Sequence, residues 1–267
     1  MTLRSSLGLR SARLGLRHAR LAATSAATKP PRIMQDESRD GLIIIAPGDP
    51  AAHSATFVGP IHGLGDTNLG WVDVALQWHG ALPHCKFVLP NAPVAPVTLN
   101  MGMPMPSWFD VTSLSDRANQ LCNGIEESCT LVGSLIAEEL AAGVPQHRIV
   151  VGGFSQGGAL SLYAGLQHQG QLAGVCVLSG YLPKAAGFAL APGAARTPIA
   201  HFHGAMDPTV RIEWARESAR RLRELGAASY ELVEYAELTH TASAEEIADV
   251  QAWLLERLPA LDYPRGS

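Results

Sequence analysis

The stretch that decides the fold is Arg148-Ile149-Val150-Val151-Gly152-Gly153-Phe154-Ser155-Gln156-Gly157-Gly158. Its β-branched residues indicate a buried strand, and the apolar residues from Ala159 to Leu166 recur as in a helix. Ser155 therefore stands at a sharp turn from strand to helix, where the small residues beside it let the hydroxyl rise above the sheet. The segment predicts a nucleophilic serine. The alternative is a merely structural Gly-rich turn.

Strands and helices alternate on both sides of this segment. We expect further strands at residues 41–47, 54–58, 86–90, 175–179, 199–203 and 230–235. We expect a long loop at residues 91–113, and helices at residues 117–142, at 211–225 and from the Ser243 cap onward. Such alternation predicts one α/β domain with a mostly parallel central sheet covered by helices on both faces.

A nucleophilic serine needs a histidine base and a carboxylate that orients the base. In α/β-hydrolases these follow the serine in the order acid, then histidine. Asp207 follows the strand that ends near His203, and His240 follows the last predicted strand. Both stand at carboxyl ends of strands, where functional side chains gather in open α/β sheets. His201 and His203 lie within a strand and fit buried core positions better, and an ordinary Asp-Pro turn is the alternative for Asp207.

The negative oxygen that forms during acyl transfer needs backbone N–H donors. The Gln156 N–H, directly after the nucleophile, is one candidate, because the start of a helix has free donors. The second is the Leu64 N–H in the loop His62-Gly63-Leu64-Gly65-Asp66, which follows an early strand. A tight glycine turn without a catalytic role is the alternative for this loop.

The composition is that of a folded protein. Of the 267 residues, 47% are hydrophobic and 16% are charged, which excludes a disordered chain, and the net charge of −4 argues against a nucleic-acid partner. No apolar run approaches the roughly 20 residues that a membrane-spanning helix needs. The four cysteines are expected to be free thiols, and no cluster of His, Asp or Glu has the spacing of a metal site.

The N-terminal head differs from the rest of the chain. Residues 1–35 contain seven Lys or Arg and no Asp or Glu, a net charge of +7, which leaves 13 basic and 24 acidic groups, a net charge of −11, on the other 232 residues. An Arg- and Ser-rich segment without acids is typical of a transit peptide, and a disordered extension without an address is the alternative. We therefore expect a basic extension at residues 1–40 and one catalytic domain at residues 41–267.

Several runs of the sequence resemble one known family, the acyl-protein thioesterases, also called the lysophospholipase–carboxylesterase family. The resemblance covers roughly residues 55–260. The runs that carry it are His62-Gly63-Leu64-Gly65-Asp66-Thr67, Val97-Thr98-Leu99-Asn100, Pro106-Ser107-Trp108-Phe109-Asp110, Gly152 to Leu162, Leu172-Ala173-Gly174-Val175 and His203-Gly204 with Asp207-Pro208.

The resemblance implies a compact α/β-hydrolase without a large lid, which hydrolyses long-chain acyl thioesters on protein cysteines and needs no cofactor or metal. Carried over residue by residue, it assigns the roles of nucleophile, base, orienting carboxylate and two oxyanion donors to Ser155, His240, Asp207, Leu64 and Gln156. For the walls of an acyl groove it implies Leu99, Met101, Trp108 and Tyr181.

The resemblance also implies partners and a location. S-acylated proteins or lysophospholipids would be the substrates, reached by transient contact with a membrane surface, and the enzyme would be cytoplasmic. The basic head makes import into mitochondria or plastids the alternative location.

Two other functions stay open. One is a carboxylesterase or lysophospholipase that acts on small esters or lysolipids, and the other is a catalytically weakened binding module. The second is suggested by Gly59-Pro60, which we expect to interrupt the strand that leads to His62, because Pro cannot donate to a β-ladder.

Overall fold

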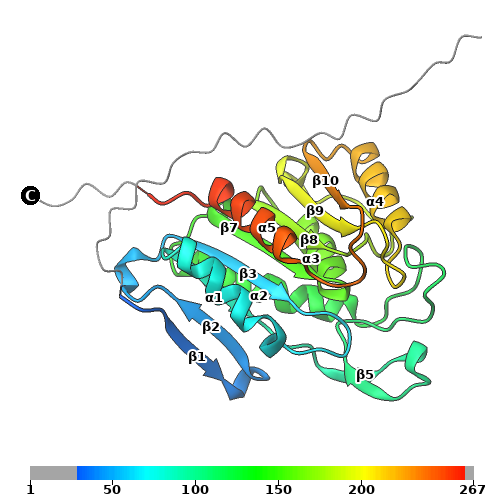
Figure 1. Ribbon diagram of the computed structural model, residues 1–267, viewed down its shortest axis with the longest axis horizontal. Coiled ribbons are helices and arrows are strands. Elements are labelled where there is room, and N and C mark those ends of the chain that lie inside the picture. The colour runs from blue at the N-terminus through cyan, green and yellow to red at the C-terminus, as the bar shows by residue number, and fades with distance from the viewer. Residues whose placement is uncertain (1–28, 262–267) are drawn as a thin grey trace, which may run out of the picture.

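A computed structural model of the protein describes residues 29–261, which form one α/β domain around a twisted sheet (Figure 1). Within that range the sheet has eight strands in the order β1-β2-β4-β3-β7-β8-β9-β10. β1 and β2 join antiparallel at one edge, and the pairs from β4 to β10 are parallel. The strands are Arg32–Asp36 (β1), Leu42–Ala46 (β2), Ala55–Ile61 (β3), Cys85–Leu89 (β4), Ile149–Phe154 (β7), Gly174–Leu178 (β8), Ile199–Gly204 (β9) and Tyr230–Tyr235 (β10).

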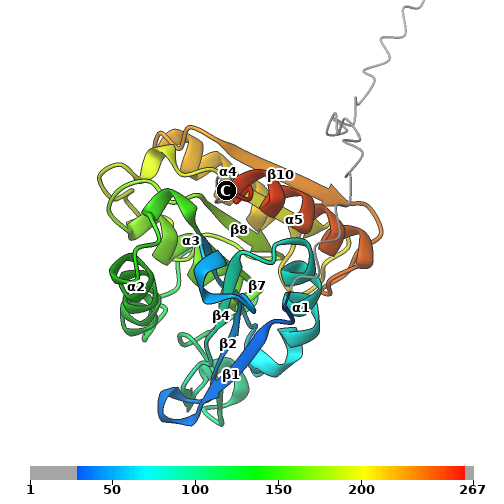
Figure 2. The same ribbon diagram turned by 90° about the vertical axis from the view of Figure 1, so that its left-hand side faces the viewer.

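Helices cover both faces of the sheet, as predicted. Figure 2 views it from the β1 edge, with α2 (Ile125–Ala141) and α3 (Gln156–Gln167) on one side and α1 (Val72–Ala81) and α5 (Ala244–Arg257) on the other. α4 (Ile212–Glu224) packs on the α3 side against β9 and β10. No helix among residues 29–261 is long and apolar enough to cross a membrane.

The expected domain boundary at residue 40 is wrong, because β1 lies before it. Arg32–Asp36 pairs with Leu42–Ala46 along its whole length. Its first four residues are exposed, so the strand has no alternation of apolar and polar side chains that a sequence pattern could reveal. Most of the expected transit peptide, residues 1–28, lies outside the described residues, and the import hypothesis stays a prediction.

The helix predicted from residue 117 begins only at Ile125. Cys122 has a backbone φ of 50° and Gly124 one of 94°, so both are left-handed and end any helix there. Leu121, one of the apolar residues in the predicted helix, is 76% exposed. The loop predicted at residues 91–113 contains a small hairpin instead of irregular chain alone, formed by β5 (Val94–Pro96) and β6 (Pro104–Pro106).

β3 is not interrupted at Gly59-Pro60. The strand continues to Ile61, and only its register against β7 shifts between Val58 and Ile61. Gly59 has φ +137°, and a Cβ there would lie 2.1 Å from the Gly152 carbonyl oxygen, so this close approach of two strands requires glycine. The expected interruption of the strand that leads to His62 is therefore wrong, and the strand is buried over its whole length.

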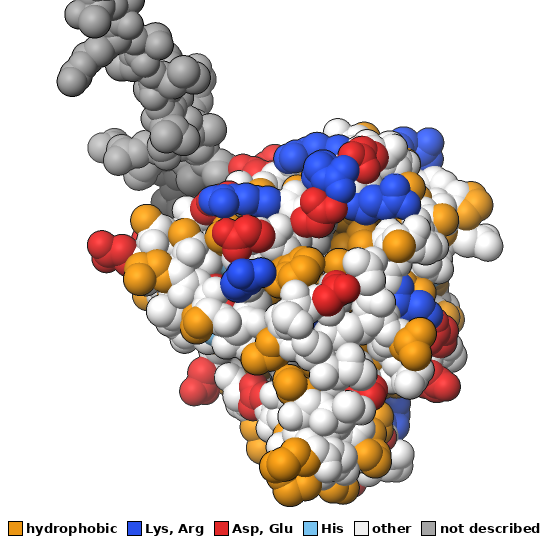
Figure 3. All heavy atoms as spheres, turned by 90° about the vertical axis from the view of Figure 1, so that its right-hand side faces the viewer, with side chains coloured by type: hydrophobic (Ala, Val, Ile, Leu, Met, Phe, Trp, Pro, Cys, Tyr) orange, Lys and Arg blue, Asp and Glu red, His pale blue; other side chains and the backbone are white. Residues whose placement is uncertain are grey.

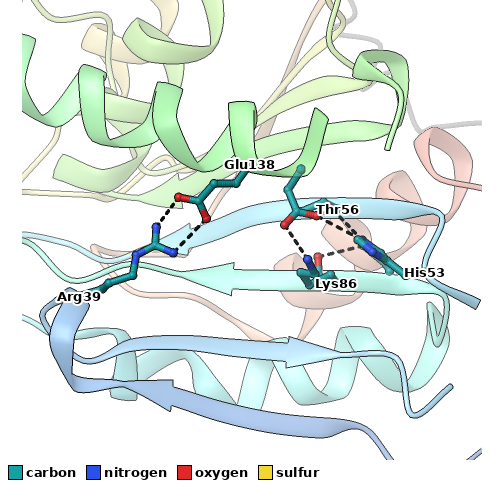
Figure 4. A network of polar contacts seen from close by, with 7 residues as sticks. Arg39, His53, Thr56, Lys86 and Glu138 are labelled. Carbon is teal, nitrogen blue, oxygen red and sulfur yellow. Dashed lines mark hydrogen bonds and ion pairs between the residues drawn. The ribbon is translucent and has the colours of Figure 1, made fainter. Parts of the chain in front are cut away.

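Two neighbouring glutamates of α2 form polar contacts with residues of the sheet and of the turn after β1 (Figure 4). Glu139 is 5% exposed and accepts hydrogen bonds of 2.6 Å from Thr56 Oγ1 and from Lys86 Nζ. His53 Nε2 lies 3.3 Å from the same carboxylate. Glu138, next to it, forms an exposed two-pronged ion pair with Arg39, with N–O distances of 2.9 and 2.8 Å. One carboxylate is therefore buried in the structure and the other remains at its surface.

Candidate active site

Ser155 lies at the turn between β7 and α3, with φ 55° and ψ −117°. A side chain other than glycine rarely adopts this backbone, and here the turn lifts the hydroxyl to the carboxyl end of the sheet. The Ser155 N–H donates to the Leu178 carbonyl over 2.9 Å, which fixes the turn to β8. A Cβ on Gly157 would lie 2.1 Å from the Ile61 carbonyl oxygen, so the flanking glycine is required by the approach of β3.

The structure brings Ser155, His240 and Asp207 together from segments far apart in the sequence. His240 Nε2 lies 2.9 Å from Ser155 Oγ, and His240 Nδ1 lies 2.6 Å from Asp207 Oδ2. The other oxygen of Asp207 accepts the N–H groups of Thr209 and Val210, each over 2.8 Å. Each member of the expected triad therefore meets the next at hydrogen-bond distance.

The carboxylate of Asp207 is ionised at neutral pH. Burial alone would raise the pKa of this group, but the hydrogen bond from His240 and those from the Val210 and Thr209 amides outweigh burial and lower it. An ionised Asp207 accepts the proton of His240 Nδ1. His240 Nε2 is then unprotonated in the neutral ring and faces the serine hydroxyl as an acceptor.

The loop after β3 packs directly against the nucleophile. A Cβ on Gly63, the residue before Leu64, would lie 3.4 Å from the Cβ of Ser155. Within the described chain, the Leu64 N–H has no hydrogen-bond acceptor. The Gln156 N–H, at the first position of α3, has none inside its helix either. Both N–H groups are therefore available to a ligand: one directly follows Ser155 in the chain, and the other follows the glycine that packs against it.

Two side chains that sequence reasoning did not single out hold these donors in place. Buried His62 accepts the Ala92 N–H at Nε2, so its Nδ1 carries the proton and donates to the Gly63 carbonyl over 2.8 Å. The Gln156 side chain accepts the Trp108 N–H and donates to the Phe109 carbonyl over 2.7 Å. Both residues lie inside the family runs, which could have drawn attention to them. Their hydrogen bonds to backbone groups could be recognised only from the structure.

The residues expected to line an acyl groove divide into two pairs. Leu99 and Met101 are exposed, at 39% and 86%, at the hairpin turn. Trp108 and Tyr181 are almost fully buried, at 1% and 2% exposed, and their place in the wall of an acyl groove stays a prediction. The Trp108 indole donates to the His62 carbonyl over 2.9 Å, and the Tyr181 ring packs under Arg117.

A hollow of about 660 Å³ lies between the hairpin and the start of α2. Its lining includes Pro93, Pro96, Trp108, Asp110, Glu127 and Leu131. Ser155, Asp207 and His240 do not line it, so it is not the place where a scissile bond would meet the triad. Across residues 29–261, no three His, Cys, Asp or Glu side chains converge in a group that could hold a metal ion.

Comparison with known proteins agrees with this arrangement. The model of the phospholipase/carboxylesterase family matches residues 40–257. The chain is 42% identical over 216 residues to acyl-protein thioesterase 1 of Mycosarcoma maydis, a match that covers 75% of this chain and 90% of that protein. It is 42% identical over 214 residues to the protein of the same name from Yarrowia lipolytica, covering 78% and 94%.

Solved structures of acyl-protein thioesterase 2 and of SOBER1 have a similar fold. The crystal structure of acyl-protein thioesterase 2 from Zea mays superposes with a TM-score of 0.73 at 30% identity, over 81% of this chain and 98% of that one. Arabidopsis thaliana SOBER1 superposes with a TM-score of 0.71 at 30% identity, over 77% and 99%.

Proposed function

The chain belongs to the phospholipase/carboxylesterase family and is a hydrolase with the α/β-hydrolase fold, and from that premise we propose that it removes long-chain acyl groups from protein cysteines. The observation that carries the proposal is the contact of Ser155 with His240 and of His240 with Asp207. Relatives that are named for acyl-protein thioesterase activity support this substrate class.

In the first half of the proposed reaction, Ser155 attacks the carbonyl carbon of the acyl thioester. His240 Nε2, 2.9 Å from the hydroxyl, takes its proton, and Asp207 stabilises the imidazolium that forms. The N–H groups of Leu64 and Gln156 bind the negative oxygen of the tetrahedral intermediate. The bond from the acyl carbon to sulfur then breaks, the leaving cysteine sulfur takes the proton from His240, and the acyl group stays on Ser155.

In the second half, water replaces the cysteine. His240 takes a proton from the water, and the hydroxide attacks the acyl carbon. The same two donors bind the oxyanion, and the bond to Ser155 Oγ breaks as His240 returns the proton to the serine. A thioester places a small demand on acid catalysis, because a thiol is much more acidic than an alcohol.

The second candidate function is hydrolysis of small oxyesters or lysolipids, which the family description itself favours. Turnover of one series separates the two: S-acyl peptides and O-acyl esters with chains of 4 to about 16 carbons. We expect kcat/KM to rise with chain length and to be higher for the thioester than for the oxyester of the same acid. A preference for short oxyesters would contradict depalmitoylation and favour the carboxylesterase reading.

The hairpin supports the expected transient contact with a membrane surface. Its exposed apolar side chains are Val94, Leu99, Met101 and Met103. Figure 3 shows hydrophobic side chains gathered at the end of the molecule where Figure 1 places β5. Long acyl groups on proteins lie in membranes, so an apolar tip suits an enzyme that must reach them.

Co-sedimentation with neutral phosphatidylcholine vesicles tests this contact. Met101→Asp should lower the bound fraction, because a charge replaces the most exposed apolar side chain of the hairpin. Leu121→Asp is the matched control, since Leu121 is similarly exposed (76% against 86%) but lies outside the hairpin. Equal loss in both variants would contradict a specific role for the hairpin.

A further inference from the structure

A chain of buried hydrogen bonds runs behind the triad along β9 and β10. His201 and His203 project from the same face of β9, and both are fully buried. The Tyr230 hydroxyl lies 2.6 Å from His201 Nδ1, and His201 Nε2 lies 3.1 Å from His203 Nδ1. His203 Nε2 lies 2.7 Å from the Val210 carbonyl oxygen. The proposed hydrolysis does not use any of these three side chains directly.

The direction of every hydrogen bond in this chain follows from its last acceptor. A carbonyl oxygen has no proton, so His203 Nε2 must donate to Val210. Burial lowers the pKa of both histidines, which keeps both rings neutral with one proton each. His203 Nδ1 is then an acceptor and His201 must donate from Nε2. By the same reasoning, His201 Nδ1 accepts from the Tyr230 hydroxyl.

The chain ends on the residue that holds the triad carboxylate. Val210 accepts from His203 with its carbonyl, and its own N–H donates to Asp207 Oδ1 over 2.8 Å. The same His203 nitrogen lies 3.6 Å from Asp207 Oδ2, the oxygen that binds His240. Hydrogen bonds therefore hold both the carbonyl and the N–H group of Val210. The proton on His203 Nε2 is also close to the negatively charged carboxylate of Asp207.

We propose that His203 is a positioning residue for the hydrolysis, which holds the turn from Asp207 to Val210 so that Asp207 Oδ2 faces His240, and that Tyr230 and His201 lock the tautomer of His203 that this task requires. The inference rests on the proposed function, because it assumes that the contact between Asp207 and His240 matters for turnover. Misplacement of a catalytic group by about 1 Å lowers the rate on the order of 100-fold, so a relaxed turn has a measurable effect.

Replacement of His203 separates donation from packing. His203→Leu fills the space without a donor, and we expect kcat for a thioester substrate to fall about 10- to 100-fold with KM changed less than about 3-fold. His203→Gln supplies an amide donor toward Val210 and an oxygen toward His201, and it should recover most of the lost rate. Tyr230→Phe leaves His201 Nδ1 without its donor and should lower kcat in the same direction by a smaller factor.

Thr56→Val is the matched stability control, because it removes a buried hydrogen bond of 2.6 Å to Glu139 that belongs to the α2 attachment. It should lower the free energy of unfolding and leave kcat unchanged. A second readout is the downfield proton NMR resonance of His240 Nδ1–H, which reports the contact with Asp207. That resonance should shift or broaden in His203→Leu and return in His203→Gln.

If His203→Leu lowers stability as Thr56→Val does but retains the wild-type kcat and the His240 resonance, His203 is a packing residue and the inference is wrong. The same holds if His203→Gln is as slow as His203→Leu. Failure of the proposed function itself looks different, because Ser155→Ala would then retain the activity of the wild-type protein.

Discussion

Asp207 divides its two oxygens between the backbone and the base. Oδ1 accepts from Thr209 and Val210, and Oδ2 accepts from His240. The order of Ser155, Asp207 and His240 along the sequence, each at the carboxyl end of a strand, was sufficient to predict that they would meet. The backbone donors to Asp207 could not be predicted, since they depend on the local turn.

Asp207→Asn tests the role of that carboxylate. An amide donates through its nitrogen, so it favours the His240 tautomer whose proton lies on Nε2 and faces the serine. We expect kcat for a thioester substrate to fall about 10,000-fold while the fold is kept. Steady-state kinetics and a circular dichroism melting curve check both points. A loss below about 10-fold would contradict the assigned orienting role.

The two aromatic residues expected in the wall of an acyl groove are almost fully buried. Trp108 lies in a family run and Tyr181 follows the predicted strand at residues 175–179, but whether such a ring faces a groove or the core depends on neighbours far away in sequence. Trp108 binds the His62 carbonyl 46 residues away, and Tyr181 lies against Arg117. Local pattern carries no information on contacts of that kind.

At the scale of elements, the predictions succeeded where apolar residues follow a period. The predicted strand at residues 230–235 matches β10, and the predicted helix at 211–225 nearly matches α4. They failed where special backbone conformations decide the boundary. The start of α2 is set by left-handed residues Cys122 and Gly124, and the hairpin of β5 and β6 consists of three-residue strands with prolines at their ends.

The attachment of α2 to β3 and β4 predicts a dependence of stability on acid pH. Burial would raise the pKa of Glu139, but hydrogen bonds with His53, Lys86 and Thr56 outweigh it and lower the pKa to about 2 from 4.5. Because the pKa of Glu139 is lower in the folded state than in the unfolded state, its ionised carboxylate stabilises the fold at pH values above the unfolded pKa. This contribution, on the order of 3 kcal/mol, should be lost as pH falls from about 4.5 to 2.

Urea unfolding of Glu139→Gln between pH 7 and pH 3 measures this contribution. The variant should be less stable than wild type at pH 7, and the difference should shrink as pH falls. Glu138→Gln is the matched control, because its ion pair with Arg39 is exposed and contributes at most about 1 kcal/mol. A difference for Glu139→Gln that stays constant with pH would contradict the account.

At the scale of the whole molecule, the alternation of strands and helices was sufficient to predict the parallel sheet and its two covered faces. It could not predict the antiparallel edge, because β1 buries almost nothing and its pairing with β2 depends on backbone hydrogen bonds. β1 nevertheless covers the apolar strand Leu42–Ala46, which would otherwise be an exposed edge.

Two N-terminal truncations test this arrangement. A protein that begins at residue 29 should keep the stability of the full chain. One that begins at residue 41 loses β1 and the Arg39–Glu138 ion pair, and its free energy of unfolding should fall by about 2 kcal/mol or more, since each lost hydrogen bond contributes roughly 1 kcal/mol. Equal urea midpoints for the two forms would contradict a structural role for β1. A fluorescent protein fused to residues 1–40 tests the import hypothesis separately.

We expect Ser155 to form an acyl-enzyme during hydrolysis of a long-chain thioester. Intact-protein mass spectrometry after a rapid acid quench measures it, with a palmitoyl thioester peptide as substrate. We expect one added palmitoyl group on Ser155 in the wild-type protein, none in Ser155→Ala, and a loss of about a millionfold in kcat in that variant. A Ser155→Ala protein that still carried the acyl group, or turned over the thioester at a rate near that of wild type, would contradict it.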